Sequence, residues 1–149
     1  MELAVGEIYI LLSRSFRHDP RLRALFGLLA SEEDAHARRV REVAQLWQEK
    51  GINTPPTLNI QRYRHLLAHA QLLRQKLALV DEIDESTAFE LAATLENDFN
   101  DVHAESLAAN HDPMLVMLFT ELAEGDRGHA ALIARDAEKS KESASELQD

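Results

Sequence analysis

Two carboxylates, each followed three residues later by a histidine, are the residues of this chain best suited to chemistry. Glu33 and His36 form the first pair, and Asp126 and His129 form the second. On a helix, residues three apart lie on one face, so each pair presents a carboxylate beside an imidazole. Divalent transition metals such as iron, manganese and zinc are bound by these two kinds of side chain. Each pair therefore predicts half of a metal site.

The spacing alone is weak evidence, because 26 acidic residues and 7 histidines in 149 positions give about one such pair by chance. The surrounding sequence is more informative, since it is repeated. Residues 18–37 and 111–130 are identical at ten of twenty positions, at a constant offset of 93. A duplicated helix that carries a duplicated carboxylate–histidine pair predicts a centre with two metals.

Both pairs lie on the inward faces of expected amphipathic helices. A helix predicted over residues 20–50, and another predicted from residue 113, have apolar residues at three- and four-residue spacing around their pairs. An Asp-Pro step marks the start of each helix, with Asp19 and Asp112 as the expected N-caps. Gly51 is expected to end the first of these helices.

Two further glutamates lie on the apolar faces of the other long helices. A helix predicted from the start of the chain to about residue 18 carries Glu2 on its apolar stripe. Glu7 falls about 140° away around the same helix and should face water. A helix predicted from residue 86 or 87 to about residue 110 carries Glu96 in the equivalent position.

Four carboxylates and two imidazoles are thus expected to converge inside one bundle. Burying ionised carboxylates without compensation costs several kcal/mol apiece, which a marginally stable domain cannot tolerate four times. Two divalent cations would balance the four negative charges if the histidines are neutral. The predicted metal ligands are Glu2, Glu33, His36, Glu96, Asp126 and His129.

The composition predicts a single all-helical domain, because Ala, Leu, Glu and Arg abound whereas the chain has only 5 Gly and 4 Pro. A paired proline interrupts the helical pattern after residue 50 and begins a long connection. The expected organisation is a hairpin over 1–50, a crossover over 51–85 with an accessory helix at 61–80, and a hairpin over 86–139. These segments form one domain over 1–139, followed by a frayed polar tail over 140–149.

Charge and composition also exclude several classes of protein. The formal net charge of -10 is opposite to that of proteins that bind nucleic acid or anionic lipid. The absence of cysteine removes disulfides, thiolate zinc sites and iron–sulfur clusters. No stretch approaches the ~20 apolar residues of a membrane span, and the start has no basic, apolar leader. A cytoplasmic protein with neither nucleic-acid nor membrane partners is expected.

At these residues the chain resembles the ferritin-like superfamily, and within it the rubrerythrin-like di-iron proteins that lack a rubredoxin domain. The resemblance extends from residue 2 to about residue 137. It implies a ferritin-like four-helix bundle made of two duplicated hairpins. It also implies that Glu2 and Glu96 are terminal ligands, that Glu33 and Asp126 bridge the metals, and that His36 and His129 each bind one metal.

The resemblance further implies an oxidoreductase in which ferrous iron reduces dioxygen or hydrogen peroxide. Without a rubredoxin domain the reductant would be an external electron donor, and proteins of this type commonly form homodimers. Two positions depart from the family. Asp126 stands where a longer glutamate is usual, and Phe99 stands where rubrerythrins proper carry an extra glutamate, which puts peroxidase activity in question.

These departures motivate an alternative, which is a metal-binding or interaction bundle that holds iron, manganese or zinc without turnover. The remaining histidines are interpreted as structural. His65 and His69 lie beside arginines on a face expected to be solvated, and His18 and His111 belong to the repeated turn. His103 lies two helical turns from Glu96, at the position that matches Tyr9, and is expected to be at most an outer partner of the ligands. 

Overall fold

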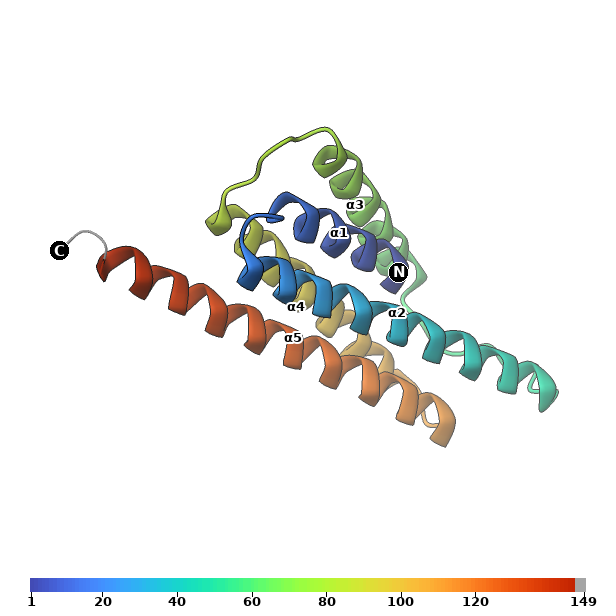
Figure 1. Cartoon of the computed structure of the whole chain (residues 1–149). Helices are drawn as coiled ribbons and strands as arrows, with labels where there is room; N and C mark the ends of the chain where they lie inside the picture. The colour runs from blue at the N-terminus through green and yellow to red at the C-terminus, as the bar shows by residue number, and fades with distance from the viewer. Residues whose placement is uncertain (147–149) are drawn as a thin grey trace.

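The structure of the protein, a computed structural model, describes residues 1–146 and is built from helices, with no strand in that range (Figure 1). The all-helical prediction is confirmed. None of the helices in the described part combines the length and the apolar composition that a membrane crossing requires. In chain order the helices are α1 (Glu2–Ser15), α2 (Pro20–Glu49), α3 (Ile60–Ala78), α4 (Glu85–Ala109) and α5 (Pro113–Glu146).

The two Asp-Pro steps begin helices as the sequence predicts. Asp19 accepts hydrogen bonds from two backbone N–H groups in the first turn of α2, at 2.9 and 3.1 Å. Asp112 accepts one from the N–H of Met114 at 2.8 Å, at the start of α5. Gly51 follows α2 with a φ of 64°, a conformation that favours glycine and ends the helix. The first helix is shorter than expected, because it ends at Ser15 rather than near residue 18.

The start of α4 corrects the prediction of Ser86 or Thr87, because the helix already begins at Glu85. The N-cap is Asp84, whose carboxylate accepts hydrogen bonds from the backbone N–H of Thr87 at 2.8 Å and from its hydroxyl at 2.6 Å. Both Ser and Thr are good capping residues. An aspartate placed just before them takes that role here and moves the start upstream.

The predicted polar tail over 140–149 also needs a correction, because α5 continues through residues 140–146 as helix. The cause is a set of contacts at Ser140. Its hydroxyl lies 2.6 Å from the guanidinium of Arg21 and in contact with the carboxylate of Glu85, which ties this part of α5 to the starts of α2 and α4. Residues 147–149 of the predicted tail lie outside the described residues.

The helices pack as two hairpins, α1 with α2 and α4 with α5, called here the N-terminal and the C-terminal hairpin (Figure 1). The crossover between them contains α3, which packs against α1 and α4. The two hairpins also meet where α2 contacts α5. Side chains from α1, α2, α4 and α5 can therefore point into a shared interior.

Two apolar clusters fill this interior and leave a polar layer between them. Along α2, Leu29 belongs to the larger cluster and Val43 to the smaller one. Along α5 the order is reversed, with Leu122 in the smaller cluster and Ile133 in the larger one. The carboxylate–histidine pair of each helix lies between these residues in the sequence. The fold thus places both pairs at one level of the bundle.

Candidate metal centre

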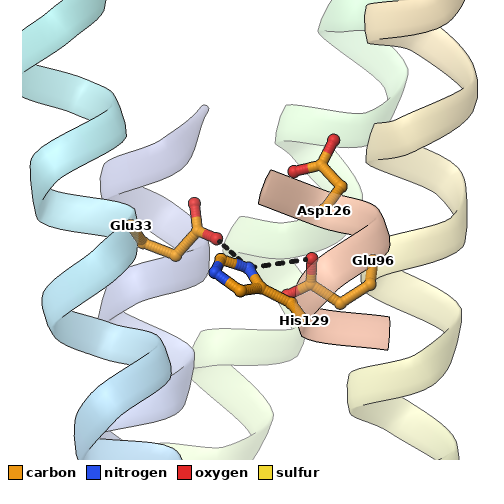
Figure 2. Close-up of side chains that lie close together, drawn as sticks. All are labelled: Glu33, Glu96, Asp126 and His129. Carbon is orange, nitrogen blue, oxygen red and sulfur yellow. Dashed lines mark hydrogen bonds and ion pairs between the residues drawn. The ribbon is translucent and has the colours of Figure 1, made fainter. Parts of the chain in front are cut away.

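Five of the six predicted ligands are buried, and the sixth, His36, is half-buried. Figure 2 shows four of them pointing toward one another from three helices: Glu33 from α2, Glu96 from α4, and Asp126 and His129 from α5. Glu2 lies in the first turn of α1. Glu7, which the sequence places on the opposite side of α1, is exposed and pairs with Arg74 at 2.8 Å.

The potential ligand atoms form two groups, each with its atoms within 4.8 Å of one another. The first group contains Glu33, Glu96, Asp126 and His129, and the second contains Glu2, Glu33 and His36. Only Glu33 belongs to both groups. Carboxylate and imidazole donors of this kind bind divalent transition metals, so the buried cluster could hold a metal ion.

His129 lies at the centre of the first group, between carboxylates from both hairpins. Its Nδ1 is 3.1 Å from Oε1 of Glu33 and 3.3 Å from Oε2 of Glu96 (Figure 2). Burial lowers the pKa of His129, but the hydrogen bonds and charges of these two glutamates outweigh it and raise the pKa to about 11. Without a metal, His129 is therefore protonated and stabilises the carboxylates around it.

His103 has a larger part than the sequence predicted, because it contacts carboxylates of both hairpins. Its Nδ1 lies 2.7 Å from Oδ2 of Asp126, and its Nε2 lies 3.4 Å from Oε1 of Glu2. Burial lowers the pKa of His103, but these two carboxylates raise it to about 9. Burial likewise raises the pKa of Glu2, but the hydrogen bond and charge of His103 outweigh it and lower the pKa to about 2.

Tyr9 is the counterpart of His103 on α1 and contacts Glu96. Its buried hydroxyl donates a hydrogen bond to Oε1 of Glu96. Burial, followed by the charge of Glu96, raises the pKa of Tyr9 well above its ordinary value. The tyrosine therefore remains a neutral donor. Burial also raises the pKa values of Glu96 and Asp126.

These contacts change the charge argument made from the sequence. Two histidines with raised pKa values, His103 and His129, can neutralise part of the buried negative charge as imidazolium ions. The two histidines therefore lower the cost of burying the carboxylates without balancing all four negative charges. Metal binding to this cluster would instead exchange protons for cations, which makes its affinity depend on pH.

His36 has the feature that fits a ligand position best. Its Nδ1 is buried without a hydrogen-bond partner and lies 3.7 Å from Oε2 of Glu33, which is too far for a hydrogen bond. A buried nitrogen without a partner costs about 1–3 kcal/mol, and a cation bound between these two side chains would remove that cost. Glu33 raises the pKa of His36, and this outweighs the opposite effect of burial.

Two cavities reach the cluster from different sides. A cavity of about 660 Å³ between α2 and α5 is lined by Glu32, His36, Gly125 and His129, among other residues. An apolar cavity of about 540 Å³ reaches the cluster at Glu2 and His103 from the opposite end. Its wall includes Trp47, Leu58, Tyr63, Leu115 and Phe119. The first cavity therefore has charged and imidazole side chains on its wall, whereas the wall of the second is mostly apolar.

Two residues at the polar cavity are not anticipated by the sequence. Oε2 of Glu32 lies 2.7 Å from Nε2 of His129, on the side of the ring away from the other carboxylates. Gly125 lies against His36, where an added Cβ would be 2.4 Å from Cε1 of that ring. The available signal was a departure from the repeat, since positions 32 and 125 are equivalent and differ.

The histidines interpreted as structural lie away from the cluster. His65 and His69 are exposed on α3, and His18 and His111 are exposed at the turns before α2 and α5. Phe99, at the position where the family that the sequence resembles has a glutamate, is buried and packs edge-on against His103 at a centroid distance of 6.4 Å. It contributes no ligand to the cluster.

Comparison of the chain with protein-family models, with curated proteins and with solved structures finds no match. The functional interpretation therefore depends on the repeat, on the geometry of the buried cluster and on the chemistry of its side chains.

Proposed function

We propose that this protein is a ferritin-like, rubrerythrin-like di-iron oxidoreductase that oxidises ferrous iron with dioxygen or hydrogen peroxide. The observation that supports it most is the shared Glu33, which joins two groups of potential ligands in the interior. Such an arrangement suits two cations bridged by one carboxylate. The unpartnered Nδ1 of His36 and the four-residue group around His129 supply donors for both positions.

Each of the six predicted ligands would have a defined position around the two cations. Glu2 and His36 would hold one cation, Glu96 and His129 the other, and Glu33 and Asp126 would lie between them. When bound, two ferrous ions supply the electrons that reduce the oxidant. His103 and Tyr9 fix the orientation of carboxylates through their contacts with Asp126, Glu2 and Glu96.

The surroundings suit small, polar reactants on one side and are mostly apolar on the other. The cavity between α2 and α5 reaches the imidazoles of His36 and His129 directly, so hydrated cations and peroxide could enter there. Apolar side chains line the other cavity, which reaches Glu2 and His103. His129 must release a proton when a cation takes its place among the carboxylates, and the adjoining cavity gives that proton a path to solvent. An external electron donor and a homodimer complete the proposal.

A non-enzymatic metal-binding bundle is the second candidate, and Asp126 favours it. This aspartate belongs to only one of the two ligand groups, and one of its oxygens is bonded to His103. A bridge with one short carboxylate would bind iron, manganese or zinc while supporting little redox turnover. The two candidates agree on metal binding and differ on whether an oxidant is consumed.

The deciding experiment begins with metal analysis of protein purified without added metal, followed by anaerobic loading with ferrous iron. The proposal predicts two irons per chain, and fewer than two contradicts it. Oxygen or peroxide is then supplied together with a reductant. Sustained consumption above that of metal-free protein supports the oxidoreductase, whereas background consumption with two bound irons supports the non-enzymatic bundle. Glu7→Gln, which alters an exposed acid on α1, is a control for changes in charge outside the cluster. It should behave as the unmodified protein.

A further inference from the structure

Positions 32 and 125 occupy equivalent places in the sequence repeat, and each lies against a histidine of the other hairpin. Glu32 on α2 contacts His129 on α5. Gly125 on α5 contacts His36 on α2. The two imidazoles are therefore supported differently, although the surrounding sequence is duplicated. His36 and His129 lie close enough for their ring centroids to be 5.4 Å apart.

Glu32 contacts the His129 ring on the side that faces away from the other carboxylates. The carboxylate lies 2.7 Å from Nε2, while Nδ1 faces Glu33 and Glu96. A carboxylate on the outer nitrogen of a ligating imidazole fixes the ring orientation and makes the inner nitrogen a better donor. His129 is thereby oriented in advance for the group that contains Asp126.

Gly125 leaves the His36 ring without such support. An added Cβ would lie 2.4 Å from Cε1 and 2.5 Å from Nε2 of His36, so the absence of a side chain is what makes room for the ring. Among the described residues no hydrogen bond involves His36, and its Nδ1 is buried without a partner. Its side chain is 18% exposed, compared with 5% for His129. The ring is positioned by packing, which includes the stacked His129 ring, and by the charge of Glu33 at 3.7 Å from its Nδ1.

The cavity between α2 and α5 opens onto this unsupported ring. Glu32, Glu124 and Gly128 line it together with both histidines. A cation bound to the second group, Glu2, Glu33 and His36, would have only three ligands from the chain, and one of them, His36, is half-buried. The first group supplies four ligands, all of them buried.

We infer that the two metal positions are functionally unequal. Glu33, Glu96, Asp126 and His129 retain a divalent cation, whereas Glu2, Glu33 and His36 form an exchange position that gains and releases its cation through the cavity between α2 and α5. Residue 32 and residue 125 set this difference. The inference depends on the proposed function, since it requires two cations to bind.

The test is a titration of the metal-free full-length chain with Co²⁺, followed by visible absorption, with the rate of Co²⁺ removal by EDTA as a second measurement. We expect two ions per chain, bound in two steps whose affinities differ at least tenfold, and two-phase removal. His36→Ala should abolish the weaker step and the faster phase. His129→Ala should abolish the tighter step and the slower phase.

Two pairs of variants test the residues that create the difference. Gly125→Ala should displace His36 and abolish the weaker step, whereas its matched control Gly128→Ala should change neither step, since a Cβ there meets nothing within 4 Å. Glu32→Ala should weaken the tighter step by about 10- to 100-fold. Its control Glu124→Ala removes an acid from the same cavity that forms no ion pair with an imidazole among the described residues, and should leave the tighter step unchanged.

The outcomes separate this inference from the proposed function. Fewer than two bound Co²⁺ in the unmodified protein would overturn both. Two ions bound in one step, with equal losses in His36→Ala and His129→Ala, would overturn the inference alone and leave a symmetric two-metal centre. An effect of Glu32→Ala no larger than that of Glu124→Ala would also overturn it. If Gly125→Ala does not fold, as judged by its helical circular dichroism, His36→Ala and the Glu32 pair still decide the question.

Discussion

The two hairpins share a sequence pattern but stabilise the cluster by different means. At equivalent positions of α1 and α4, the N-terminal hairpin has Tyr9 and the C-terminal hairpin has His103. Each contacts a glutamate of the other hairpin. Tyr9 contacts Glu96, and His103 contacts Glu2. One contact is made by a neutral donor and the other by an imidazole with a raised pKa.

The carboxylates of the two carboxylate–histidine pairs differ as well. Glu33 reaches both groups of potential ligands, whereas Asp126, one methylene shorter, belongs to one. A sequence repeat can thus conserve where side chains point, while single substitutions decide which charges are balanced and which ligands are shared. Mutations at equivalent positions of the two hairpins should therefore have unequal effects.

The largest difference is expected at Glu33 and Asp126. Glu33→Ala removes a donor from both groups and should reduce the metal bound in a titration from two ions per chain to none. Asp126→Ala leaves the group of Glu2, Glu33 and His36 complete and should still bind one ion. Metal analysis with circular dichroism as the fold control distinguishes the two variants, and equal stoichiometries would remove the asymmetry that the comparison describes.

Next in size is the effect of His103→Phe on the metal-free protein. Asp126 and Glu2 would lose the buried imidazole, which lies 2.7 Å from Asp126 and 3.4 Å from Glu2. Removing one member of a buried ion pair costs about 3–5 kcal/mol. Urea unfolding in the presence of a chelator measures the loss. His69→Phe on the exposed face of α3 is the matched control and should change stability by about 0.5 kcal/mol or less. Similar values for both variants would contradict the prediction.

Tyr9→Phe should have a smaller effect than His103→Phe. It removes one hydrogen bond to Glu96 but no charged partner. A buried polar group that loses its hydrogen-bond partner costs about 1–3 kcal/mol. The same unfolding experiment gives the comparison. A loss equal to that of His103→Phe would show that the two hairpins support their glutamates equally.

The last difference is a pH dependence that belongs to the C-terminal hairpin. The pKa of His103 is raised in the folded protein to about 9, above the ordinary histidine value of about 6.5. Its stabilising contribution is therefore complete below pH 6.5 and is lost as the pH rises through 9. The free energy of unfolding of the metal-free protein should fall between pH 7 and 10, by up to about 1.4 kcal/mol per pH unit for this proton. Urea unfolding of His103→Phe should lack this part of the slope.

Local signals in the sequence were sufficient for most of the fold. The Asp-Pro steps and Gly51 define the ends of helices through capping and turn geometry, which depend on neighbouring residues only. The apolar stripes likewise place six polar residues inward, because the face of a helix follows from its period. The start of α4 was misplaced because Asp84 competes with two other good capping residues.

The contacts that distinguish the hairpins depend on how helices lie against one another. That Glu32 meets His129 follows from the crossing of α2 and α5, and that His103 meets both Asp126 and Glu2 follows from the relative height of α1, α4 and α5. Neither is encoded in a spacing. The continued α5 helix around Ser140 has the same origin, since Arg21 and Glu85 hold it from other helices.

The apolar cavity gives the molecule an optical reporter of its own. Trp47 is the chain's single tryptophan, and it lines this cavity while its Nε1 donates a hydrogen bond to the backbone oxygen of Thr54 at 3.2 Å. Glu2 and His103 lie on the wall of the same cavity. Its indole emission should therefore report the polarity of this cavity without any added label.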